Sequence, residues 1–299
     1  MADVVSRIQN GENLFAPELV ADLVNKVKGK SALAVLSGGR AIPFNGLKEF
    51  VFTMDDEIDI VAENGPKSRA HMGIAPRTIV PIKFEYGARL SDEFMYASEE
   101  EGMEILKNFN DGFAKKVARG LDIAAMHGLN PRTKTLSAVV GANNFDAEVL
   151  QTVTPGGQDA NQQVEAAIAM VQGMEEDVTG IAMAPAFRSE LSKITIQGGV
   201  PLFPSLAWGN APGSINGLPV EVNSTVAYNG STDRAIVGNF HDGFRWGYSK
   251  QIPTELIQYG DPDNSGNDLK GYNQVYLRAE VYLGWAILDD TMFARILSA

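Results

Sequence analysis

The chain has 299 residues, 44% of them hydrophobic, and a formal net charge of −12. This length allows roughly three quarters of the unfolded surface to be buried, in one large domain or two lobes. The lack of cysteine excludes disulfides, thiolate catalysis and sulfur-ligated metal. The basic residues are scattered, which argues against a dedicated nucleic-acid-binding protein. The N-terminus has no signal-peptide pattern and no apolar run is long enough to span a bilayer, so we expect no membrane association.

The first predicted elements are short. Pro17 opens a helix with apolar residues on one side, and this helix ends at the break formed by residues 28–30. A second short apolar turn spans residues 31–36 and stops at Gly38 and Gly39. We expect this part of the chain to dock as an N-terminal arm.

The next segment predicts a long two-stranded arm. Its outgoing strand candidates are Glu49–Thr53 and Glu57–Val61, and the returning strand is Ile82–Leu90, which alternates apolar and polar residues at a period of two. Residues 62–76 between them are polar and rich in turn residues, with too few large apolar residues for a core of their own. A hairpin this exposed needs another surface to cover it.

From Ser98 the apolar period changes to three or four residues, which predicts an amphipathic helix that ends near Gly128. The apolar stripe consists of Leu106, Phe109, Phe113, Val117 and Leu121. A helix of about 30 residues is roughly 45 Å long.

A second lobe is predicted from about residue 147. Residues 160–174 and 186–194 have helical patterns, and residues 180–184, 218–222 and 234–240 have strand patterns. The last block, residues 250–260 and 274–297, is predicted to form extended strands that return to pair with the first lobe. The sequence therefore predicts an α+β protein.

Few residues suggest chemistry. His71, His127 and His241 are not spaced as ligands of one metal ion, so no metal site is predicted from them. The acidic run at residues 55–57 is predicted to be a solvated turn, because its side chains alternate between two faces. No nucleophile-elbow, phosphate-loop or dinucleotide-binding pattern is present. We predict no enzyme, no catalytic residue, no cofactor and no bound metal.

One loop begins like a calcium-binding loop. Asp261, Asp263, Ser265 and Gly266 follow the first half of that pattern. The position that needs a bidentate glutamate is Tyr272, so the segment is predicted to be a turn before the last strands.

Five short segments, taken in order, carry a resemblance that covers nearly the whole chain. They are Ile60-Val61-Ala62-Glu63, Leu90-Ser91-Asp92-Glu93, His127-Gly128 at the end of the long helix, Gly217-Leu218-Pro219-Val220 and Arg278-Ala279-Glu280. In order and spacing the chain resembles the major capsid protein family of tailed phages. The resemblance implies the Hong Kong 97-like capsid fold, which that family shares with encapsulins.

The resemblance also implies a division of the chain. We expect an N-terminal arm at 1–46, an extended hairpin called the E-loop at 47–80, a P-domain at 81–146 with a spine helix at 98–127, an A-domain at 147–245, and a return to the P-domain at 246–299.

The function implied is that of the major capsid (head) protein of a tailed bacteriophage. Such a protein self-assembles into pentamers and hexamers of an icosahedral shell, which encloses double-stranded DNA without sequence-specific binding. The expected partners are other copies of the chain, a scaffolding protein, a portal and cement proteins. The expected location is the virion, after assembly in the host cytoplasm. The alternative is an encapsulin-like nanocompartment around a protein cargo, and a soluble α/β enzyme is a third possibility.

Some members of this family cross-link their shells through an isopeptide bond. Aligned with that pattern, the lysine, asparagine and glutamate positions fall on Lys67, Asn273 and Glu280. The bond would require a neutral Lys67 amine to attack the Asn273 carboxamide while Glu280 takes the proton. The alternative is a solvated Lys67 and a turn-forming Asn273.

The predicted spine helix contains Gly102, Gly112 and Gly120. Each glycine costs about 0.8 to 1.0 kcal/mol relative to alanine inside a helix. Close packing against the sheet is one interpretation, and helix bending that differs between pentamers and hexamers or during shell expansion is the other.

Overall fold

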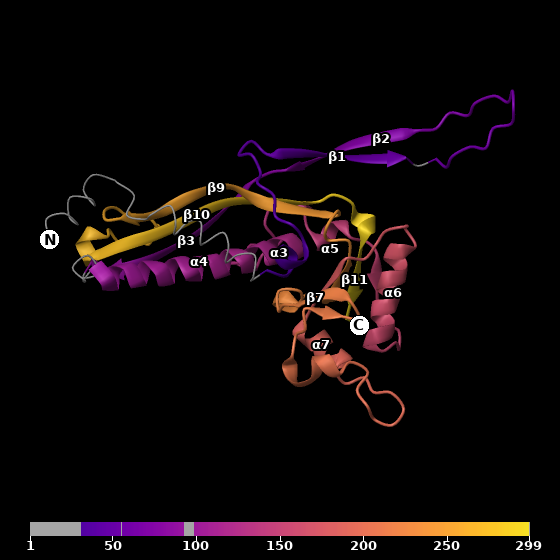
Figure 1. Cartoon of the computed structure of the whole chain (residues 1–299). Helices are drawn as coiled ribbons and strands as arrows, with labels where there is room; N and C mark the ends of the chain where they lie inside the picture. The colour runs from indigo at the N-terminus through magenta and orange to yellow at the C-terminus, as the bar shows by residue number, and fades with distance from the viewer. Residues whose placement is uncertain (1–30, 55, 93–98, 299) are drawn as a thin grey trace.

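The computed structural model describes residues 31–54, 56–92 and 99–298, and it shows two lobes and a long hairpin (Figure 1). The first lobe is an elongated sheet with one long helix beside it. The second lobe lies at one end of that sheet, and the hairpin extends away from both lobes (Figure 1). The helix predicted from Pro17 lies outside the described residues. Within the described ranges, no helix is long and apolar enough to cross a membrane.

The first lobe is built on a three-stranded antiparallel sheet with the order β3-β10-β9. The strands are β3 (Ile82–Ser91), β9 (Phe244–Ile257) and β10 (Gln274–Ile287). Helix α4 (Glu99–His127) runs along one face of this sheet (Figure 1), which confirms the long amphipathic helix predicted from the sequence. Of its apolar stripe, Leu106, Phe113, Val117 and Leu121 are buried and Phe109 is half-buried, because the sheet covers this side of the helix.

The hairpin consists of β1 (Leu47–Met54) and β2 (Met72–Ile79), which pair antiparallel along their whole length. The prediction that Ile82–Leu90 is the returning strand of the arm is wrong, because that segment lies in β3 and pairs with β10. The predicted strand Glu57–Val61 is also wrong, since these residues form no strand.

Strand β2 escaped prediction for a physical reason. It contains Gly73 and Pro76, and most of its residues are exposed on both faces of the hairpin. A strand without a buried face has no selection for the apolar alternation by which strands are recognised. Proline is tolerated here because a two-stranded hairpin leaves one edge of each strand unpaired.

The second lobe is built on a six-stranded mixed sheet with the order β4-β11-β8-β5-β7-β6. Its strands are β4 (Thr152–Val153), β5 (Gly180–Met183), β6 (Ser214–Ile215), β7 (Leu218–Val222), β8 (Asp233–Gly238) and β11 (Phe293–Leu297). Helices α6 (Ala160–Gln172) and α7 (Pro185–Leu191) pack against this sheet around a second apolar core. The helices and strands predicted for residues 160–240 are confirmed within a few residues.

The end of the chain departs from the prediction. The last block was expected to return entirely to the first lobe, but β11 pairs with β8 and β4 in the second lobe. Strands β9 and β10 do belong to the first lobe. Because both kinds of strand are equally apolar, pattern alone does not say which sheet a strand joins.

Several short elements complete the chain. α5 (Phe145–Glu148) and the 3-10 helix η5 (Asp290–Met292) lie where the chain passes between the lobes, α3 (Ala32–Leu36) precedes β1, the 3-10 helices η2 (Pro204–Gly209) and η3 (Tyr228–Gly230) belong to the second lobe, and the 3-10 helix η4 (Lys270–Tyr272) lies between β9 and β10. Leu33 of α3, Phe113 of α4 and Phe240 of the second lobe share one continuous core with Trp285 of β10. The lobes are therefore joined by apolar packing as well as by the chain.

Candidate assembly surfaces

The hairpin exposes one apolar face. The register pairs Phe50 with Pro76, Phe52 with Ile74 and Met54 with Met72, and directly opposed residues lie on the same face of a hairpin. The large side chains of this face, Phe50, Phe52, Met54, Met72 and Ile74, are 54% to 68% exposed. We call these five residues the hairpin apolar face. An exposed apolar surface of this kind marks a site of association.

A second exposed apolar surface lies on the second lobe, on the loop after α7. Trp208 is fully exposed and has a left-handed backbone with φ of 57°, which is uncommon for a bulky residue. Ile196, Val200 and Leu202 of the same loop region are also exposed. A large aromatic side chain held out in this way is typical of an interface anchor.

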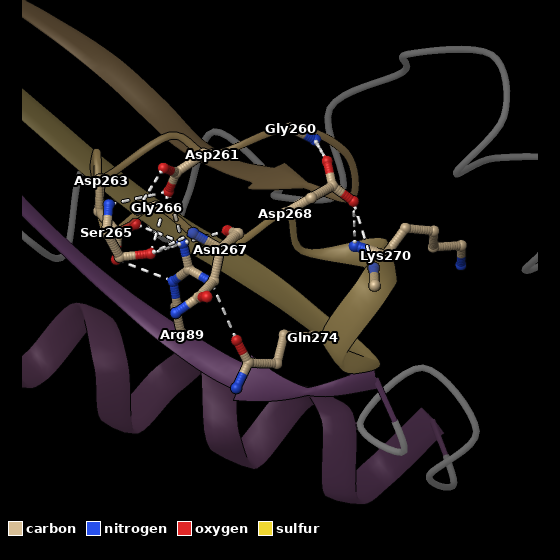
Figure 2. Close-up of polar contacts among 11 residues, drawn as sticks. Arg89, Gly260, Asp261, Asp263, Ser265, Gly266, Asn267, Asp268, Lys270 and Gln274 are labelled. Atoms are coloured by element: carbon tan, nitrogen blue, oxygen red, sulfur yellow. Dashed lines mark hydrogen bonds and ion pairs between the residues drawn. The ribbon is translucent and has the colours of Figure 1, made fainter.

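A polar loop closes the tip of the first lobe, between β9 and β10, and surrounds the guanidinium of Arg89 from β3 (Figure 2). Arg89 Nη2 lies 2.7 Å from Asp261 Oδ1 and 2.5 Å from Asp263 Oδ1. It also lies 2.5 Å from Ser265 Oγ and 2.9 Å from the carbonyl oxygen of Asn267. The hydrogen bond from Arg89 lowers the pKa of Asp263, and the same bond raises the pKa of Arg89.

A buried carboxylate ties three parts of the chain together. Asp122 of α4 accepts hydrogen bonds from the backbone nitrogens of Ala32 and Leu33 at 2.9 and 3.3 Å, at the start of α3. It also accepts one from Thr225 Oγ1 of the second lobe at 2.8 Å. Burial raises the pKa of Asp122, and the hydrogen bonds oppose that rise because they favour the ionised form.

Four charged or titratable side chains from four elements meet at the joint between the lobes. His127 ends α4, Asp146 lies in α5, Asp233 begins β8 and Arg295 lies in β11. Arg295 donates to Asp146 Oδ1 at 2.6 Å and to Asp233 Oδ1 at 2.9 Å. His127 Nε2 lies 2.8 Å from the carbonyl oxygen of Thr225, so it donates there, because a carbonyl only accepts.

The other ring nitrogen of His127, Nδ1, faces the carboxylates of Asp146 and Asp233. His127 Nδ1 lies 3.0 Å from Asp146 Oδ2 and 3.9 Å from Asp233 Oδ2. Two carboxylates, one guanidinium and a neutral imidazole leave one negative charge, which a single shared proton neutralises. The ligand atoms of His127, Asp146 and Asp233 lie within 4.8 Å of one another, so they could also surround a metal ion. A divalent ion would leave one excess positive charge beside Arg295, and we therefore favour the proton.

The pKa shifts in this cluster agree with a shared proton. Burial raises the pKa of Asp233 to about 7. Burial lowers the pKa of His127, but the hydrogen bonds to Asp146 and Thr225 and the nearby carboxylate charges together outweigh it, so the pKa is raised. Burial raises the pKa of Asp146, but its hydrogen bonds and the charges of His127 and Arg295 together outweigh burial, so the pKa is lowered. Spacing along the sequence did not indicate this cluster, because its members are far apart in the chain and meet only in the fold.

The candidate cross-linking residues do not meet within one chain. Lys67 is exposed in the distal part of the hairpin, and Asn273 has a left-handed backbone with φ of 53° at the end of η4. Glu280 Oε1 lies 2.6 Å from Lys83 Nζ. Asn273 directly precedes β10 and Glu280 lies seven residues further along this extended segment, or roughly 23 Å at about 3.3 Å per residue. A reaction among the three would need residues from different subunits.

Comparisons with known proteins find a matching family and similar solved structures. A model of the phage capsid family matches residues 11–296. The chain is similar to a solved structure from Mycobacterium phage Ogopogo, with 29% identity, a TM-score of 0.78 and coverage of 90% of this chain and 92% of that one. It is also similar to a structure from Gordonia phage Cozz, with 24% identity, a TM-score of 0.72 and coverage of 90% and 87%. No curated protein matches.

A third similar structure is the capsid of an empty GTA particle, with 14% identity, a TM-score of 0.66 and coverage of 90% of each chain. A hairpin with an uncovered apolar face, a long helix on a narrow sheet and a second lobe define a subunit of a shell. The chain belongs to the phage capsid family. It is a major capsid protein with the Hong Kong 97-like fold, as the order of its sequence elements indicated, and the encapsulin-like alternative is not favoured.

Proposed function

We propose that this chain forms pentamers and hexamers that close into the icosahedral head of a tailed bacteriophage. The hairpin apolar face supports this proposal most directly. Its five large side chains are left uncovered by the lobes of their own chain, so a neighbouring copy is needed to remove them from water. The hairpin extends well beyond the lobes and can therefore reach such a neighbour (Figure 1).

A closed shell needs two different complementary patches on each subunit, because a heterologous contact generates a ring when its rotation closes. The second patch that we propose is the loop around Trp208 on the second lobe. Its strained, fully exposed tryptophan gains nothing from its own chain, and contact with a copy in the same ring would offset the cost.

We further propose that the shell encloses double-stranded DNA without sequence-specific contacts, and that its role is structural and not enzymatic. The net charge of −12 supports this, because an acidic inner wall repels phosphates and keeps the genome from adhering. We also propose that the shell assembles in the host cytoplasm with a scaffolding protein, a portal and cement proteins. These partners are proposed because the chain belongs to the phage capsid family.

Electron microscopy of the purified protein tests the proposal. The wild-type chain should form closed shells. Phe52→Glu places a charge in the hairpin apolar face, where burial against a neighbour would desolvate it, so we expect few or no shells. Because Phe52 is exposed within the subunit, circular dichroism and thermal unfolding of the free subunit should be unchanged.

Thr53→Glu is the matched control. Thr53 is also exposed, but it points to the opposite face of the same strand. We expect this variant to assemble at or near the wild-type level. Equal assembly of both variants would show that the hairpin apolar face is not an interface, and a wild-type protein that stays a monomer under all conditions would overturn the proposed function.

A further inference from the structure

The loop at the tip of the first lobe has the spacing of a calcium-binding loop. Its first, third, fifth, sixth and seventh positions are Asp261, Asp263, Ser265, Gly266 and Asn267. Calcium loops take oxygen ligands from positions one, three and five and from the carbonyl of position seven, with glycine at position six for a sharp turn. Gly266 has φ of +84° and serves such a turn here. The twelfth position, Tyr272, provides no carboxylate.

The centre of the loop is filled by a cation that the chain supplies (Figure 2). Arg89 Nη2 has four oxygen atoms at 2.5 to 2.9 Å, one from each of positions one, three, five and seven of the loop. An Nη2 group carries two protons, so it cannot donate a full hydrogen bond to all four. A guanidinium is matched by a planar fork of acceptors, whereas several oxygens around one point match a spherical ion.

Arg89 is also held by other atoms. Its Nε donates to Asp263 Oδ2 at 2.9 Å and its Nη1 donates to Gln274 Oε1 of β10 at 3.1 Å. Asp261 in turn accepts from the backbone nitrogens of Ser265 and Gly266 at 3.0 and 2.7 Å. The Arg89 side chain is 16% exposed in consequence. These bonds fasten the loop to β3 and β10.

We propose that Arg89 is the built-in cation of this loop: its guanidinium takes the position of a divalent ion, so that the tip of the first lobe keeps its shape without metal. This role belongs to the single subunit and does not depend on shell formation. Chelators should leave the tip intact, and a hard divalent cation should enter the loop only when the guanidinium is removed.

The charges explain this exclusion. Asp261 and Asp263 carry two negative charges, and Arg89 neutralises one of them within the loop. A divalent ion that arrives while Arg89 is in place would meet a positive charge at the same position, and the two cations repel each other. Without Arg89, two carboxylates, a hydroxyl and a carbonyl are left facing one point. Such a loop, lacking the twelfth-position carboxylate, should bind Ca²⁺ with a dissociation constant on the order of 10⁻⁴ to 10⁻³ M.

Terbium luminescence on the full-length chain tests the proposal, since Tyr272 lies near the loop and can sensitise a bound Tb³⁺. We expect no saturable signal from the wild type and a saturable signal, reversed by excess Ca²⁺, from Arg89→Ala. The double variant Arg89→Ala with Asp263→Asn should lose that signal. Arg278→Ala is the matched control, because it removes a guanidinium of the same sheet that pairs with Glu255 outside the loop.

A second measurement follows the backbone of the loop in the wild type and in Arg89→Ala. Hydrogen exchange of the Gly266 amide, which donates to Asp261, should be the same in wild type with EDTA or with Ca²⁺. Arg89→Ala should exchange this amide at least about tenfold faster, and Ca²⁺ should slow it again. Faster wild-type exchange in EDTA, saturable Tb³⁺ binding by the wild type, or no binding by a folded Arg89→Ala would each overturn the proposal.

Discussion

At some positions the residue type is restricted because two backbone segments approach each other closely. Gly247 of β9 is an example, because a Cβ atom there would lie 1.5 Å from the carbonyl oxygen of Arg40. The nitrogens of Arg40 and Ile42 donate to the carbonyls of Trp246 and Tyr248, each at 2.9 Å, so the segment after α3 lies directly on β9. Glycine is required at 247 by this approach.

Gly247→Ala should therefore destabilise the subunit. The backbone oxygen cannot move aside as a flexible side chain would, so the segment after α3 must shift, and overpacking of this kind costs about 1 to 3 kcal/mol. Urea unfolding of the free subunit measures the change. Gly271→Ala is a suitable control, because a Cβ atom at 271 would meet nothing within 4 Å. Equal stability of Gly247→Ala and wild type would contradict the close approach.

At the scale of elements, the surroundings of Gly120 and Gly112 in α4 distinguish the two interpretations of these glycines, which are close packing against the sheet and bending of the helix. A Cβ atom on Gly120 would lie 3.2 Å from the ring of Phe84, so close packing against β3 accounts for this glycine. A Cβ atom on Gly112 would meet nothing within 4 Å, and packing within the subunit does not account for it. Bending of the helix between different shell environments stays a prediction for Gly112.

Gly112→Ala separates the effect of glycine on helix stability from its effect on helix bending in the shell. Alanine in an open helix interior should stabilise the free subunit by about 0.8 to 1.0 kcal/mol, measured by urea unfolding. If Gly112 lets α4 bend, the variant should also change the size or the expansion of the shell, which a particle reconstruction would show. Shells identical to those of the wild type would reject the bending hypothesis while leaving the stability prediction intact.

At the scale of the whole molecule, the two lobes meet at the cluster of His127, Asp146 and Asp233, to which the charge balance assigns a shared proton. The pKa of Asp233 is raised to about 7 in the folded protein, mainly by burial. The pKa of His127 is also raised, because its hydrogen bonds and the nearby carboxylates together outweigh the lowering effect of burial. A raised folded pKa gives stability that is present at low pH and lost as pH rises through the folded value. The joint should thus weaken on the alkaline side.

We expect the free energy of unfolding to fall as pH rises from 5 to 8, with a slope of up to about 1.4 kcal/mol per pH unit for one proton. Asp146, whose pKa is lowered, has the opposite effect, but only in the acid range below this window. Asp233→Asn keeps the neutral form at every pH, so its slope should be smaller even if its stability is lower. Parallel pH profiles of the two proteins would contradict the shared proton.

The cross-link implied by the family resemblance also belongs to the assembled molecule, since Lys67, Asn273 and Glu280 of one chain lie apart. Denaturing gel electrophoresis of boiled mature particles tests it. Ladders of covalent oligomers that disappear in Lys67→Arg and Asn273→Asp would establish the bond. Monomers alone would leave Asn273 as a turn residue and Glu280 as the partner of Lys83, the roles that the subunit already shows.

Local patterns determined the elements that have one buried face. The spacing of Phe113, Val117 and Leu121 predicted α4 because this stripe is buried in the core of the first lobe. The same reasoning found the helices and strands of the second lobe. The order of these elements carried the resemblance to a capsid subunit, and the family match confirms it.

The tertiary structure decided what local patterns do not encode. Strand β2 has no buried face, so no apolar alternation revealed it, and only its pairing with β1 defines the hairpin apolar face. Arg89 is separated from Asp261 by 172 positions, and the proton-holding joint gathers residues from four elements. Periodicity reports on burial within one element, whereas contacts between distant segments arise only when the sheets have formed.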